Sequence, residues 1–118
     1  METKEGFYRL VFSGTSGAGV AVMVLDSGMV VGADTAAVIY DGTYQHDPKS
    51  DELELDLKVI VPPGVAIVQG IPALAMEHKF WVRARIPRRF TGTQVLDAES
   101  QFGPVKFRLT KIRDFPPD

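Results

Sequence analysis

The sequence contains no cysteine. Without thiols the chain cannot form disulfides, thiolate metal sites or a cysteine nucleophile. It also has no apolar run near the ~20 residues that a membrane-spanning helix needs. The charged residues within positions 1–10 are not followed by the apolar segment of a signal peptide. These absences predict a cytoplasmic protein that does not enter a membrane.

Residues that carry catalytic or metal chemistry are also few. The two histidines, His46 and His78, have no second metal ligand at a suitable spacing, and His46 beside Asp47 makes a poor chelate. The glycine-rich residues 14–19 lead into a β-branched segment and lack the Gly-Lys-Ser/Thr of a phosphate-binding loop. No serine stands in a Gly-x-Ser-x-Gly turn. We therefore expect no metal, no cofactor and no enzymatic activity.

The charges are unevenly divided along the chain. The 118 residues have a net charge of −2, with 45% apolar and 24% charged residues, as in an ordinary globular protein. Residues 1–76 hold four Lys/Arg and ten Asp/Glu, whereas residues 77–118 hold nine and five. Such a division can steer a charged partner, but the two signs more often cancel across a folded surface. The length predicts a single domain, residues 1–118.

Alternation of apolar and polar residues is the clearest pattern, and it runs through residues 52–59, 80–86 and 105–110. Because side chains of a strand point alternately to two faces, these segments predict strands of an antiparallel, all-β fold. Frequent Gly, Pro and Asp turns favour a sandwich or a barrel, and a barrel leaves no edge strand exposed. Only residues 72–78 could form a helical turn. The residues expected to face the interior are Leu53, Leu55, Leu57, Phe80, Phe107 and Leu109.

Residues 19–25 are apolar on both faces of the expected strand. A strand of this kind lies at the centre of a two-layer structure or is covered by another subunit. A small barrel alone would leave one of its faces exposed. We therefore expect a homodimer whose interface includes Val22, Met23 and Leu25.

Residues 28–45 combine glycine, aspartate and tyrosine, and could form either the rim of a catalytic pocket or the turns of a sheet. Gly32 permits two strands to approach closely, and Asp34 can hydrogen-bond the backbone of the turn that it begins. Tyr40 and Tyr44 offer rings for packing and hydroxyls for a partner. We interpret the segment as hairpin structure.

Residues 79–90 interleave arginines with aromatic residues, a combination that can hold single-stranded nucleic acid. The acidic total charge argues against that function, and Phe80 belongs to the inward set. We expect Trp81 to cover the sheet or a neighbouring subunit with an arginine stacked on its ring. Nucleic acid is not the expected partner.

The first sixty residues contain four motifs in order: a Gly-aromatic-Tyr strand, a Gly-Val strand, a Gly-x-Asp turn and a Tyr-x-Gly-x-Tyr strand. Their positions are Gly6, Phe7, Tyr8, Gly19, Val20, Gly32, Asp34, Tyr40, Gly42 and Tyr44. This ordered set resembles the GrlR-like family of negative regulators of type III secretion. The family has Gly-Gly-Asp at the turn, and Ala33 replaces its second glycine here.

The resemblance implies an eight-stranded, lipocalin-like antiparallel barrel that forms dimers and sequesters a transcriptional activator through an acidic loop. The counterparts of that loop are Asp51, Glu52 and Glu54, with Leu53 interrupting the acidic run. The sequence therefore leaves two alternative functions: a regulator that acts by protein–protein contact, and a carrier whose lumen binds a small apolar ligand. The inward residues do not decide between them, because a filled and a hollow barrel are both lined by apolar side chains.

Overall fold

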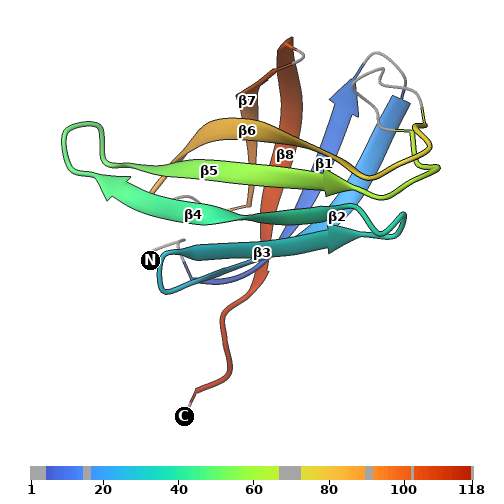
Figure 1. The fold of residues 1–118 in the computed structure, drawn as a ribbon. Coiled ribbons are helices and arrows are strands. Elements are labelled where there is room, and N and C mark those ends of the chain that lie inside the picture. The colour runs from blue at the N-terminus through green and yellow to red at the C-terminus, as the bar shows by residue number, and fades with distance from the viewer. Residues whose placement is uncertain (1–4, 15–16, 67–72, 90–91, 102, 118) are drawn as a thin grey trace.

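The computed structural model describes residues 5–14, 17–66, 73–89, 92–101 and 103–117. These residues form strands and, within the same ranges, no helix, so none of them belongs to a helix that could cross a membrane (Figure 1). The strands are β1 (Gly6–Gly14), β2 (Gly17–Asp26), β3 (Met29–Asp34), β4 (Ile39–Asp47), β5 (Glu52–Val61), β6 (His78–Pro87), β7 (Thr93–Ser100) and β8 (Gly103–Arg113).

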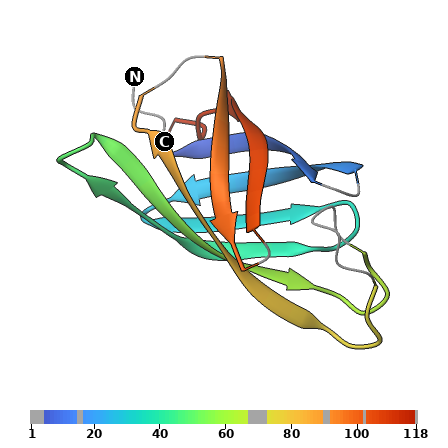
Figure 2. The ribbon, with the colours of Figure 1, turned by 90° about the horizontal axis from the view of Figure 1, so that it is seen from above.

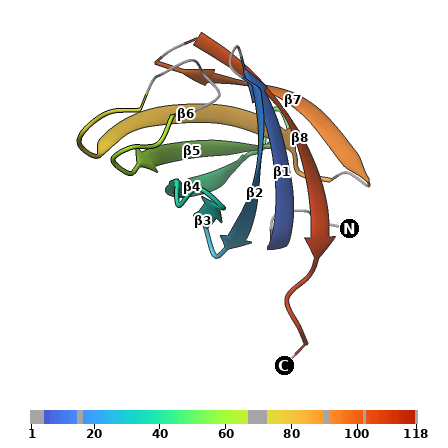
Figure 3. The same ribbon diagram turned by 90° about the vertical axis from the view of Figure 1, so that its right-hand side faces the viewer.

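Each strand pairs antiparallel with the next one, and β8 returns to β1 to close a barrel. In Figure 1, β3–β6 run across the view, whereas β1, β2, β7 and β8 run steeply, because the strands of a barrel tilt against its axis. Figure 3 shows the two groups on opposite sides of the interior. The predicted eight-stranded antiparallel barrel is confirmed. The helical turn considered for residues 72–78 is not formed at 73–78, which are irregular before β6 begins at His78, and Pro72 lies outside the described residues.

Among the residues that the structure describes, the seam between β6 and β7 is the shortest in the barrel, since these strands pair there only through residues 82–84 and 98–100. Next to this segment, the backbone amide of Trp81 donates a 2.9 Å hydrogen bond to the side-chain oxygen of Gln101. In the other direction β6 and β7 diverge, as Figure 2 shows. A short ladder and this side-chain hydrogen bond therefore join the two strands at the seam.

The interior follows the alternation of the sequence. In β5, Leu53, Leu55 and Leu57 are buried and the residues between them are exposed, which is the period-two pattern expected for a strand with one face inside. All six residues predicted to face the interior are buried. Tyr8, Leu10 and Phe12 of β1, and Met23 and Leu25 of β2, are buried in the same way.

Two glycines let neighbouring strands approach closely. A Cβ atom on Gly32 in β3 would lie 2.8 Å from the carbonyl oxygen of Val22 in β2. A Cβ atom on Gly42 in β4 would overlap the carbonyl oxygen of Asp56 in β5. No side chain fits at such distances, so the close strand approach predicted for Gly32 is confirmed. Glycine at these two positions therefore permits the close approach of β3 to β2 and of β4 to β5.

Candidate functional site

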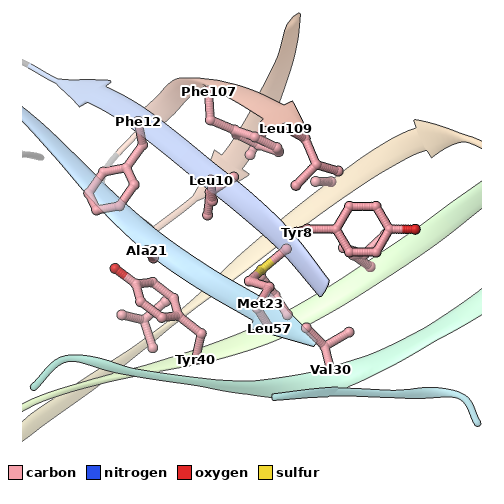
Figure 4. Close-up of a cluster of buried hydrophobic side chains, with 14 of the residues drawn as sticks. Tyr8, Leu10, Phe12, Ala21, Met23, Val30, Tyr40, Leu57, Phe107 and Leu109 are labelled. Atoms are coloured by element: carbon pink, nitrogen blue, oxygen red, sulfur yellow. The ribbon is translucent and has the colours of Figure 1, made fainter. Parts of the chain in front are cut away.

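The barrel is packed at one end and hollow at the other. The packed end holds residues with no exposed surface, among them Tyr8, Leu25 and Ile86. The hollow end, where β3 turns into β4 and β5 leads toward β6, encloses a cavity of about 270 Å³. Figure 4 shows Phe12 and Tyr40 at this end, projecting from β1 and β4. The cavity is the candidate functional site.

The six residues predicted to face the interior divide between the two ends. Those that line the cavity are Leu55, Leu57, Phe80 and Phe107. Leu53 and Leu109 do not line it and are fully buried in the packed end. The alternation of the sequence correctly placed the inner faces of β5, β6 and β8, but it carried no information about position along the barrel axis.

Small residues create the space. Ala84 in β6 and Ala98 in β7 stand opposite each other in the strand register, and both line the cavity. Ala18 and Gly19 in β2 line it from another side. Small side chains at these positions leave volume that larger residues would fill, since protein interiors are otherwise close-packed. This grouping of small residues is the signal that reading one strand at a time overlooks.

Among the described residues, the wall of the cavity contains one hydrogen-bonded polar pair, Asp34 and Tyr40. The hydroxyl of Tyr40 donates a 3.1 Å hydrogen bond to Oδ2 of Asp34. Oδ1 of Asp34 accepts hydrogen bonds from the backbone amides of Ala36 at 2.9 Å and Val38 at 3.1 Å. The ring of Tyr40 packs edge-on against Phe12 with centroids 6.3 Å apart. An apolar lining with a single hydrogen-bonding pair is typical of small-molecule sites.

Asp34 is fixed by the turn that it begins. Its carbonyl oxygen accepts a 3.1 Å hydrogen bond from the amide of Ala37, and Ala37 has a φ of 67°, in the left-handed region that few residues other than glycine adopt. The backbone and side-chain hydrogen bonds of Asp34 together hold this turn. The predicted role of Asp34 in its own turn is therefore confirmed. Its contact with Tyr40 was not predicted.

The position of Tyr40 makes its hydroxyl hard to ionise. Burial raises the pKa of Tyr40 well above its usual range, and the negative charge and hydrogen bond of Asp34 raise the pKa further. The hydroxyl therefore keeps its proton at neutral pH. It donates that proton to Asp34 and retains an acceptor lone pair.

The carboxylates of the predicted acidic loop lie beside histidine and arginine side chains. Oδ1 of Asp51 contacts Nε2 of His46 and Nε of Arg88, each at 2.8 Å. Nη1 of Arg85 lies 3.5 Å from Glu52, and Nη2 of Arg85 lies 3.4 Å from Glu54. The carboxylates of the loop are therefore paired within the same molecule.

Strand register explains these pairs. Glu54 faces Arg85 and Asp56 faces Arg83 across the antiparallel ladder of β5 and β6. Arg85 also reaches Asp47 at 3.1 Å. The pKa of Asp47 is lowered by a hydrogen bond from the backbone amide of Lys49 and then by Arg85. The acidic and the basic halves of the chain thus meet on one outer face and balance each other.

The arginine stacking predicted for Trp81 is confirmed. The guanidinium of Arg83 lies 4.9 Å from the ring centroid of Trp81, in a cation–π contact on the outer face of β6. Arg85 and Arg88 are engaged with carboxylates. Residues 79–89, the part of this segment that the structure describes, present no continuous row of unpaired arginines for a phosphate backbone.

Of the three residues predicted at a dimer interface, two lie elsewhere. Met23 is 1% exposed and Leu25 is fully buried, both inside the barrel, so the prediction for them is wrong. Because β2 is apolar on both faces, its sequence gives no contrast from which to choose the inner one. Val22 is 47% exposed and does lie on the outside. With Val22, the large apolar residues exposed on the outer face of β2–β4 are Val20, Met29, Val31 and Ile39.

Comparisons with known proteins do not assign this chain to a family. No family model matches the chain, and no curated protein is similar to it in sequence. The resemblance to the GrlR-like family stays a prediction. Within the described ranges, no three His, Asp or Glu side chains come together as a metal ion would require.

Proposed function

We propose that this protein binds a small, mainly apolar molecule in the cavity at the hollow end of the barrel. The observation that carries the proposal is the cavity itself, about 270 Å³ lined almost entirely by apolar side chains. A buried apolar cavity of about 150 Å³ is enough to bind benzene. Eight-stranded barrels have interiors that either side chains fill or one small ligand occupies.

The alternative function, regulation through the acidic loop, has less support. A basic partner would have to displace Arg85 and Arg88 from the loop carboxylates before it could bind them. Electrostatic attraction between proteins is strongest where charge is unbalanced. The cavity is therefore the better candidate for the site of function.

Binding of an uncharged fluorescent probe, N-phenyl-1-naphthylamine, tests the proposal. We expect its emission to rise and saturate at about one probe per barrel. Ala84→Phe should abolish this rise, because Ala84 lines the cavity and a phenyl group would occupy it. Val31→Ser, on the outer face, is the matched control and should bind as the wild type does. Non-saturable emission, or unchanged binding by Ala84→Phe, would contradict the proposal.

A second candidate function is self-association through the outer face of β2–β4. Val22, Val31 and Ile39 are each about half exposed on neighbouring strands, at 47%, 50% and 42%. Contiguous apolar surface of this kind marks a site of interaction. Arg9 borders it beside Val22, and Asp41 borders it beside Val31. A two-fold axis can bring the Arg9 side of one copy against the Asp41 side of the other, so the face suits a second copy of this chain.

Light scattering tests this association. We expect a dimer at micromolar concentration for the wild type and a monomer for the double variant Val22→Asp with Val31→Asp. Both residues point outward, so the variant should keep the β-sheet circular dichroism of the wild type. The control is Val95→Asp, since Val95 is 54% exposed on β7, away from this face. A monomeric wild type would contradict the proposal.

A further inference from the structure

The polar pair in the cavity wall restricts which molecules the cavity accepts. A carboxylate has about four acceptor positions. Asp34 uses two on Oδ1 for the amides of Ala36 and Val38, and one on Oδ2 for the hydroxyl of Tyr40. One acceptor position on Oδ2 and one on the Tyr40 oxygen remain for a ligand. Both positions accept a hydrogen bond, and neither donates one.

The charge of the cavity wall has one sign only. Among the described residues that line the cavity, Asp34 alone carries a charge, and the other polar side chains are Thr35 and Tyr40. No arginine, lysine or histidine stands among them to receive an anionic group. A carboxylate brought to this wall would meet the negative charge of Asp34, and the repulsion between like charges opposes its binding.

Resting on the proposed function, we propose that the cavity selects amphiphiles with a hydrogen-bond-donating head, above all a primary ammonium, and rejects those with a carboxylate head. The head lies at Asp34 and Tyr40, and the apolar tail lies against Leu57, Phe80 and Phe107. A charge-assisted hydrogen bond from an ammonium to Oδ2 of Asp34 is stronger than one between neutral groups. An alcohol can donate to the same oxygen without the charge.

The volume sets the size of the tail. The cavity, at about 270 Å³, is almost twice the ~150 Å³ that accepts the six carbon atoms of benzene. The part of a ligand that lies inside the cavity therefore has about a dozen non-hydrogen atoms. Decylamine, decanol and decanoate have this size and differ only in the head, so they form a matched set of probes.

Displacement of N-phenyl-1-naphthylamine by these three compounds at pH 7, below the concentrations at which they form micelles, tests the selection. We expect decylamine to bind at least tenfold more tightly than decanoate, with decanol between them. Asp34→Asn keeps an oxygen for the amides of the turn but removes the charge. In that variant the ratio of decylamine to decanoate affinity should fall to about threefold or less, while decanol should change little.

The outcomes separate this inference from the proposed function. If decanoate displaces the probe as well as decylamine does, or if Asp34→Asn keeps the wild-type ratio, the selection is overturned and the cavity remains a binding site. If the probe does not bind in the cavity at all, both are overturned. The wild-type ratio decides the inference by itself where Asp34→Asn proves unfolded by circular dichroism.

Discussion

A single aspartate links the local backbone to the chemistry of the cavity. Asp34 holds the turn between β3 and β4 through the amides of Ala36 and Val38, and the same side chain accepts the hydroxyl of Tyr40. The turn role could be predicted because it depends on residues next to each other in sequence. The contact with Tyr40 could not, since it depends on how β4 returns beside β3.

Tyr40→Phe tests this link through the pH dependence of stability. Removing the hydroxyl should lower the free energy of unfolding at pH 7 by about 1–3 kcal/mol, because its partner is charged. The pKa of Tyr40 is raised from 10.0 by folding, so its contribution is complete below pH 10 and is lost as the pH rises further. The difference between wild type and variant should therefore shrink above pH 10, by at most about 1.4 kcal/mol per pH unit. Urea unfolding at pH 7, 9 and 11 measures it, and a constant difference would contradict the prediction.

Strands with a polar face could be predicted well, and strands without one could not. In β5 the alternation of leucine with charged residues identified the inner face correctly at Leu53, Leu55 and Leu57. In β2 every position from 20 to 25 is apolar, and Met23 and Leu25 were wrongly placed outside. Burial of one face gives a strand its register only where the two faces differ.

The leucines of β5 test the boundary between the packed and the hollow end. Leu53→Ala should cost about 2–5 kcal/mol, because Leu53 is fully buried among close neighbours and its removal leaves a new cavity. Leu57→Ala should cost clearly less, since Leu57 already borders the cavity and fewer contacts are lost. Urea unfolding of the two variants provides the comparison. Equal losses would mean that the two ends are equally packed.

The pairing of charges across β5 and β6 could not be predicted from the sequence, although the sequence did identify both charged segments. Which carboxylate meets which arginine depends on the register of the hairpin, and Glu54 opposite Arg85 is one result. The same register pairs Asp56 with Arg83. Opposite charges at facing positions support a ladder, whereas like charges would oppose it.

Arg85→Gln tests the role of this pairing in acid. A hydrogen bond from the amide of Lys49, and then Arg85, hold the pKa of Asp47 below 3.8, so this stabilisation is present above that pH and is lost as the pH falls through the lowered pKa. Without Arg85 the pKa of Asp47 rises, and the barrel should unfold at a higher pH. Circular dichroism during acid titration measures the midpoint. Arg83→Gln is the control, because Arg83 lies 3.8 Å from Asp56 and both side chains are more than 60% exposed, so this pair contributes little. An equal shift of the unfolding midpoint in both variants would contradict the prediction.

At the scale of the whole molecule, the barrel combines one end built for stability with another that keeps space. The closed ladder and the packed end hold the fold, and the small residues of the hollow end give up contacts that larger ones would make. Such an arrangement is stable only if the packed end and the ladder compensate for the cavity. It also means that larger side chains should be able to fill the cavity without loss of the fold.

Two matched alanine substitutions test this division. Ala98 is 1% exposed and lines the cavity, so Ala98→Leu should fill space and raise the free energy of unfolding by about 0.5–2 kcal/mol. Ala21 is 2% exposed but does not line the cavity, so the same change there should overpack the interior and cost about 1–3 kcal/mol. Ala98→Leu should also bind N-phenyl-1-naphthylamine more weakly, because the probe and the new side chain compete for one volume. Urea unfolding and probe titration measure both effects.

Two results would contradict these expectations. If Ala98→Leu is stabilised but binds the probe as the wild type does, the probe binds outside the barrel. If Ala98→Leu is destabilised, the cavity cannot accept a larger side chain without strain.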